Sequence, residues 1–125
     1  LISLSMKPYQ DARVEGEKLA KQYAELEEAD QVDFYNGLEG YYSVLGHNKK
    51  QEAIAVLIEK NDHKIYVYQL DKGISQDKAA TISREKGASD IDKITFGRYQ
   101  DKPIWEVKSG NQYYLVDFET GAVIQ

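Results

Sequence analysis

The sequence contains no cysteine, and this absence excludes disulfide bonds, thiolate metal sites and a cysteine nucleophile. It also has no apolar run that approaches the ~20 residues of a membrane-spanning helix. Basic residues are too few for a nucleic-acid surface: 16 Lys and Arg oppose 21 Asp and Glu, and the net charge is −5. The densest basic pair, Lys49-Lys50, falls in an expected hairpin tip. Because phosphate binding requires a concentrated basic surface, we expect no nucleic-acid partner.

Methionine is nearly absent as well. The one methionine is Met6, and the chain starts at Leu1. The stretch Leu1-Ile2-Ser3-Leu4 is apolar, so we expect it to be the end of a removed N-terminal signal anchor. We therefore interpret residues 1–8 as the end of a linker or anchor. An ordinary frayed terminus is the alternative that the residues leave open.

The remaining composition is that of a globular protein, with 42% hydrophobic and 30% charged residues in 125. An amphipathic helix is expected after Pro8, which suits a first helical turn. Its apolar face consists of residues spaced by three and four, namely Tyr9, Ala12, Gly16, Leu19, Tyr23 and Leu26. Gly16 would allow this helix to approach a sheet closely. Acidic residues disfavour a helix C-terminus, so the helix is predicted to fray near Glu28.

After this helix the period of the apolar residues changes to two, as in half-buried strands. Asn36-Gly37 and the polar tip 46–51 have the composition of hairpin turns. The strands predicted from this pattern are Gln31–Tyr35, Tyr41–Leu45, Ala53–Glu59 and Ile65–Gln69.

The second half repeats this order. Ser75 is suited to cap a helix that extends to Lys86, and Gly87 is suited to end it. Trp105 is expected in the core under that helix. The predicted strands are 91–99, 103–108, 113–118 and 122–125.

The two halves match in the order of their elements more than in their letters. The segment 41–44 corresponds to 104–107, and 55–61 corresponds to 114–120. The fold class is therefore predicted as α+β, with two consecutive units, 9–70 and 71–125, in each of which one helix packs on an antiparallel sheet. A chance likeness between two strand meanders is the alternative.

The residues that could support catalysis or metal binding are few and scattered. His47 and His63 are the only histidines, and no further His or Cys completes a zinc site. Ser43, His47 and Asp62 form a triad in name only, because no nucleophile elbow surrounds the serine.

The acidic residues are also ambiguous. Asp90 and Asp92 would lie on one face of a strand but lack a third ligand, so a polar strand entry is preferred. The segment Glu27-Glu28-Ala29-Asp30 is interpreted as a solvated helix end rather than a cation site. No catalytic, cofactor-binding or metal-binding residues are therefore assigned.

Aromatic residues are plentiful, with ten tyrosines. Adjacent tyrosines on a strand must point to opposite faces, so one of each pair can pack under a helix while the other faces outward. Outward tyrosines favour protein recognition, whereas strand propensity alone explains tyrosines that fill a small core. The candidate protein-binding residues are Tyr35, Asn36, Tyr41, Tyr42, Tyr113 and Tyr114.

At this point the second half resembles the PepSY domain pattern. The residues that carry the resemblance are Ile74-Ser75, Ala79-Ala80, Trp105-Glu106-Val107 and Asp117-Phe118-x-Thr120-Gly121. A PepSY unit alone would imply a peptidase inhibitor or a propeptide-like chaperone.

Nearly the whole chain resembles the TseB-like (YpmB-like) family of Gram-positive cell wall elongation regulators. The matching segments are Met6-Lys7-Pro8-Tyr9, Tyr35-Asn36-Gly37 and Tyr41-Tyr42-Ser43-Val44-Leu45-Gly46, followed by the PepSY-like end. This resemblance implies tandem cystatin-like units outside the cell, an N-terminal membrane helix that this chain lacks, and a class B penicillin-binding protein as partner.

The function expected from this resemblance is a non-enzymatic, membrane-anchored, extracytoplasmic adaptor that regulates cell wall elongation. The alternative is the PepSY-type inhibitor or chaperone. A third class, a small-ligand pocket between helix and sheet, would require an apolar cavity with a few polar groups.

Overall fold

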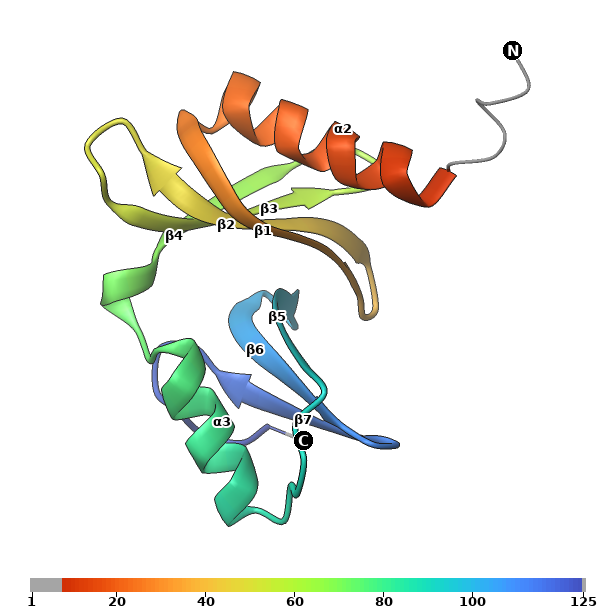
Figure 1. Cartoon of the computed structure of the whole chain (residues 1–125), viewed down its shortest axis with the longest axis vertical. Coiled ribbons are helices and arrows are strands. Elements are labelled where there is room, and N and C mark those ends of the chain that lie inside the picture. The colour runs from red at the N-terminus through yellow and green to blue at the C-terminus, as the bar shows by residue number, and fades with distance from the viewer. Residues whose placement is uncertain (1–7, 125) are drawn as a thin grey trace. The chain divides into compact units, whose positions relative to one another are not determined.

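The computed structural model describes residues 8–124, and its first part is one helix followed by a four-stranded sheet (Figure 1). The strand order is β1-β2-β3-β4, and β2 pairs antiparallel with both β1 and β3. The elements are α2 (Pro8–Tyr23), β1 (Leu26–Asn36), β2 (Gly40–Asn48), β3 (Ala53–Glu59) and β4 (Ile65–Gln69).

The second part again places one helix before an antiparallel sheet. Its sheet has the order β5-β6-β7, with β6 in the middle. The elements are the 3-10 turn η1 (Leu70–Lys72), α3 (Gln76–Glu85), β5 (Lys93–Tyr99), β6 (Lys102–Ser109) and β7 (Gln112–Asp117). The α+β class, with two helices and two antiparallel sheets, is confirmed.

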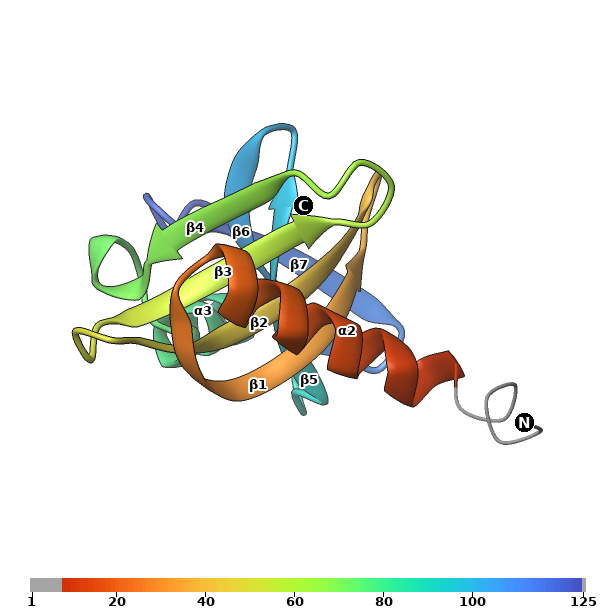
Figure 2. The ribbon, with the colours of Figure 1, turned by 90° about the horizontal axis from the view of Figure 1, so that it is seen from above.

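In the first part α2 lies across one face of its sheet (Figure 2). The core beneath it is a cluster of small and branched residues, namely Ala20, Ala24, Leu26, Val32, Val44, Ile54, Val56 and Ile58. Gly16 lets the helix come close, because a Cβ atom there would lie only 3.0 Å from the Cβ of Tyr42 on β2. The close approach expected of Gly16 is therefore confirmed.

The start and end of α3 follow from local signals in the sequence. The Ser75 hydroxyl accepts a hydrogen bond from the backbone N–H of Lys78 at 3.0 Å, which satisfies a free N–H of the first turn. Gly87 follows the helix with a φ of +116°, a conformation that favours glycine. Both expected boundary residues are confirmed.

Two predicted boundaries are wrong. The first helix ends at Tyr23 rather than near Glu28, and Glu25 reverses the chain with a φ of +57°. Leu26 is 4% exposed and already belongs to β1, so burial in the sheet overrides the helical spacing. The expected strand 122–125 is reduced to a single bridge between Val116 and Val123; Gln125 lies outside the described residues.

Contacts within the chain divide it into two compact units, and the boundary along the chain lies between Val67 and Tyr68. The sequence placed this division between residues 70 and 71. The predicted linker, residues 1–8, lies outside the described residues except for Pro8. Within 8–124, no helix is both long enough and apolar enough to cross a membrane.

Candidate functional site

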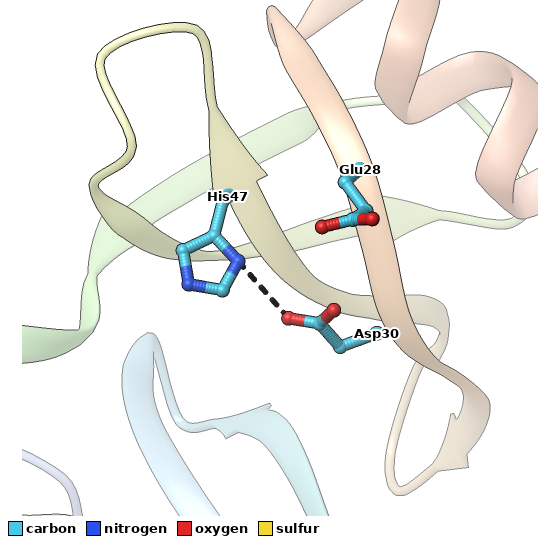
Figure 3. Close-up of side chains that lie close together, drawn as sticks. All are labelled: Glu28, Asp30 and His47. Carbon is cyan, nitrogen blue, oxygen red and sulfur yellow. Dashed lines mark ion pairs between the residues drawn. The ribbon is translucent and has the colours of Figure 1, made fainter.

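Three side chains with metal-binding chemistry converge on one edge of the first sheet (Figure 3). Glu28 and Asp30 come from β1, and His47 comes from β2. One ligand atom from each lies within 4.8 Å of the others. The Nδ1 atom of His47 is 3.1 Å from Oδ2 of Asp30. The His47 side chain is 38% exposed and that of Asp30 is 52% exposed, so solvent reaches the cluster.

Irregular pairing of β1 produces this convergence. The register between β1 and β2 shifts between Leu26 and Glu28 and again between Ala29 and Gln31. Glu28 is then the direct partner of His47, and Asp30 is the extra residue of the second bulge. Bulges of this kind redirect side chains beside functional sites.

Gly46 makes the close pairing possible. A Cβ atom at this position would overlap the backbone carbonyl oxygen of Glu28. A glycine is required because β1 passes directly over the backbone there, and no positive φ is involved.

A polar pocket of ≈ 490 Å³ adjoins the cluster. It lies between the α2 side chains Glu17 and Lys21 and the β1–β2 residues Glu28 and His47. Lys21 is held by Glu17 at 3.0 Å, which leaves the carboxylates of β1 as the main charge beside the histidine. The donor set is one imidazole nitrogen and two carboxylate oxygens, which suits a divalent cation.

From the sequence alone, these three residues were interpreted separately. Glu28 and Asp30 were assigned to a helix end and His47 to a hairpin tip, so the cluster was missed. The turn Asn36-Gly37 held a partial signal, because extending the hairpin from it brings the two segments together. The two bulges could not be predicted from the amino-acid sequence.

The other residues considered for chemistry do not assemble into a site. Ser43 and His47 lie four residues apart on β2, roughly 13 Å at the rise of a strand, so they cannot share a proton. Asp92 accepts a hydrogen bond from the Gly110 backbone N–H at 2.8 Å, and Ser109 donates to the Asp90 carbonyl at 2.7 Å. These two aspartates therefore hold the entry to β5.

The tyrosine pairs point to opposite faces, as expected, but only one pair has a strongly exposed member. Tyr42 packs against the core under α2, whereas Tyr41 is on the other face and is nevertheless only 2% exposed. Tyr41 lies 6.4 Å from Tyr35, which is also 2% exposed, and 6.3 Å from Tyr66, measured between ring centroids. Alternation predicts which face a side chain occupies but not whether that face is solvated.

The remaining candidates lie nearer to solvent. Tyr113 on β7 is 52% exposed, and Tyr114 beside it is half-buried. Asn36, at the end of β1, is exposed. It precedes Leu38, which is 76% exposed. Tyr113 and Asn36 are therefore the members of the predicted set that another protein can reach.

A group of three carboxyls surrounds the end of β3. Glu59 is 7% exposed and pairs across the sheet with Tyr41. Hydrogen bonds with the carboxyls of Glu39 and Asp62, together with burial, raise the pKa of Glu59 to about 7. The pKa of Asp62 is lowered, mainly by the hydrogen bond that it receives from Glu59. Glu59 therefore holds a proton at pH values where most carboxyls have lost theirs.

We predict that Glu59 makes stability depend on pH. Its pKa is raised from 4.5 to about 7 in the folded state, so its stabilising contribution is present below pH 4.5 and is lost as the pH rises to about 7. Glu59→Gln, which keeps a donor for Asp62, should therefore lose less stability than the wild type between pH 5 and pH 8. Urea midpoints at the two pH values measure this.

The exposed carboxyl of Glu85 provides the control, and Glu85→Gln should retain the wild-type pH dependence. Burial also raises the pKa of Glu106, so some decline with pH is expected to persist in Glu59→Gln. Equal declines in the wild type and Glu59→Gln would contradict the prediction.

Known proteins resemble this chain in sequence and in structure. Residues 15–59 match the cell wall elongation regulator TseB-like domain. A Bacillus subtilis protein described as a probable cell wall elongation regulator, TseB, is 37% identical over 114 residues, which cover 85% of this chain and 70% of the relative. The chain belongs to the TseB-like family of cell wall elongation regulators. The solved structure of the YpmB protein from Bacillus subtilis matches with a TM-score of 0.75 at 32% identity, and covers 95% of each chain.

The TseB-like match falls within the first unit. Residues 15–59 extend from α2 to the end of β3 and include Glu28, Asp30 and His47. They also include the buried tyrosines and Glu59. The Glu28, Asp30 and His47 cluster, the buried tyrosines Tyr35 and Tyr41, and Glu59 therefore belong to the part of the chain that the family model covers, whereas Asp62 and Tyr113 lie outside it.

Proposed function

We propose that this chain is the extracytoplasmic part of a non-enzymatic, membrane-anchored adaptor that regulates cell wall elongation by binding a class B penicillin-binding protein. The supporting observation is the 37% identity to a protein described as a probable cell wall elongation regulator. The structural match to the YpmB protein over 95% of the chain extends this support to both units. In this proposal the two units act as tandem cystatin-like modules.

Membrane anchoring is part of the proposal and is supported by the family resemblance of the sequence. The anchor would be a helix outside this chain, since the described residues contain no spanning helix. Fractionation of the full native gene product tests this step. The protein should remain with the membrane pellet in high salt and should be cleaved by protease added outside intact protoplasts.

The exposed aromatic and hairpin residues are the proposed contact points. Tyr113 offers a large side chain, 52% exposed, with a polar tip that suits a protein interface. Asn36, exposed at the end of β1, is the second proposed contact. Tyr35 and Tyr41, at 2% exposure, would support the fold and not touch the partner directly.

We expect the purified chain to bind the extracellular part of an elongation-specific class B penicillin-binding protein, and Tyr113→Ala to weaken that binding about tenfold. A factor of ten corresponds to ~1.4 kcal/mol, a moderate value for truncating an interface aromatic. Biolayer interferometry with the immobilised transpeptidase measures both quantities.

Tyr23→Ala is the matched control, because Tyr23 is 61% exposed and lies outside the proposed surface. It should leave the affinity within a factor of two. Equal losses in Tyr113→Ala and Tyr23→Ala would place the interface elsewhere. No binding by the wild type would overturn the adaptor proposal, and slowed substrate hydrolysis by a secreted metallopeptidase would favour the PepSY-type inhibitor instead.

A further inference from the structure

The edge of the first sheet holds a donor set that the proposed function does not use. Glu28, Asp30 and His47 face one another from two strands, with one ligand atom from each within 4.8 Å of the others (Figure 3). We propose that these three side chains bind one divalent transition-metal ion, with Zn²⁺ as the representative cation, and that the ion joins β1 to β2.

One ring nitrogen of His47 has no hydrogen-bond partner within residues 8–124. The Nδ1 atom of His47 is shielded from solvent and forms no hydrogen bond with any described residue. Asp30 Oδ2 nevertheless lies 3.1 Å away, close enough for an ion pair but not aligned for a hydrogen bond. Buried polar atoms almost always have a hydrogen-bond partner or a metal ion bound to them, and a metal ion would fill this role for the His47 nitrogen.

The distances agree with a shared cation. Zinc binds histidine nitrogen and carboxylate oxygen at ~2.0–2.2 Å, which puts two ligands of a tetrahedral ion about 3.3 Å apart. The His47–Asp30 separation of 3.1 Å is close to that edge length. A carboxylate oxygen of Glu28 lies within 4.8 Å of the other two ligand atoms, so a rotation of the Glu28 side chain would allow it to bind the same ion.

Charge and space favour the same conclusion. Glu17 and Glu27 lie along the adjoining pocket with Glu28, and the one lysine there, Lys21, is held by Glu17. The surplus of carboxylates attracts a cation. The pocket volume of ≈ 490 Å³ leaves room for water to complete the coordination shell, as in zinc sites with three protein ligands.

The imidazole ligand decides the class of metal. Ca²⁺ and Mg²⁺ take oxygen ligands, whereas a nitrogen donor with carboxylates suits Zn²⁺ and neighbouring transition metals. Bulges supply the geometry, because Asp30 is the extra residue between two paired positions of β1. An ion there would bind the irregular end of β1 to β2.

Isothermal titration of the chain with ZnCl₂ tests the proposal. We expect saturable binding with one ion per chain and much weaker binding of MgCl₂. His47→Ala and Asp30→Asn should each lower the Zn²⁺ affinity at least about tenfold, because even outer-shell changes at metal sites cost about that much. Zinc should raise the midpoint of thermal unfolding of the wild type and, at the same zinc concentration, should raise it less in either variant.

His63→Ala is the matched control, because His63 is the other histidine and is exposed in the turn after β3. It should retain the wild-type affinity and thermal shift. Asp30→Asn preserves shape and charge-independent packing, so it tests the site even if His47→Ala folds poorly. Absence of saturable Zn²⁺ binding, or equal losses in His63→Ala and His47→Ala, would overturn the proposal.

Discussion

Trp105→Ala is expected to lower the free energy of unfolding of the second unit by about 3–5 kcal/mol, the usual cost of truncating a buried large aromatic. Trp105 is 2% exposed. Its ring lies 5.0 Å from that of Phe96 and 6.4 Å from that of Phe118, in edge-to-face arrangements. Alanine would leave these two rings facing a cavity. Losses of this size are large against the total of about 5–15 kcal/mol for a typical domain.

The indole also makes a directional contact. Its Nε1–H donates to the carbonyl oxygen of Ile74 at 3.0 Å, just before α3 begins. Trp105→Phe keeps most of the ring packing and removes this bond. It should therefore cost only about 1–2 kcal/mol, since a hydrogen bond contributes ~1 kcal/mol and the smaller ring leaves some space. The pair of variants separates ring packing from the hydrogen bond.

Urea unfolding followed by circular dichroism measures both variants, because Trp105 is the single tryptophan and its fluorescence is lost on substitution. Tyr113→Ala, which truncates an exposed aromatic in the same sheet, is the control. It should change stability by less than about 0.5 kcal/mol. Trp105→Ala within 1 kcal/mol of the wild type would contradict the assignment of Trp105 to the core.

Local signals in the sequence predicted a large part of this fold. The strands Ala53–Glu59 and Ile65–Gln69 have the predicted bounds, because each is a short run of strand-forming residues bounded by polar turn residues. Ser75 caps α3 as expected, since capping depends on residues within one turn. Trp105 is buried, as expected.

Features that depend on pairing between distant residues were not predictable. Leu26 continues the helical spacing of Leu19 and Tyr23, but it is buried as the first residue of β1. A register shift between Ala29 and Gln31 then brings Glu28 opposite His47, and no periodicity in the sequence encodes it. Tyr41 points away from α2 as alternation requires, yet it is buried. Local patterns determine face and period, while exposure and register come from the assembled sheet.

Gly46→Ala is expected to destabilise the first unit by at least about 3 kcal/mol, the upper end of the usual cost of overpacking. A Cβ atom at Gly46 would overlap the carbonyl oxygen of Glu28 and would lie 2.9 Å from the Cδ1 atom of Leu26. The carbonyl cannot rotate away as a side chain could, because Glu28 is paired with His47 in the sheet. The strain can be relieved only by moving β1 away from β2.

Gly110→Ala is the control for the loss of a glycine in a hairpin. A Cβ atom at Gly110 would meet nothing within 4 Å, but the φ of +62° is unfavourable for alanine. The expected cost is therefore about 1 kcal/mol, from backbone conformation alone. Urea denaturation of both variants distinguishes overlap with a neighbouring strand from strain in the backbone. Equal costs would show that the space at Gly46 is not limiting.

Gly46→Ala also tests the proposed metal site. Gly46 permits the close pairing that puts Glu28 and Asp30 beside His47, so moving β1 outward separates the donors without removing any of them. Gly46→Ala should therefore lower the Zn²⁺ affinity at least about tenfold, as the loss of groups that hold metal ligands in place does. Gly110→Ala should bind Zn²⁺ as the wild type does. Unchanged zinc affinity in a folded Gly46→Ala variant would mean that the bulged pairing of β1 does not hold the donors in place.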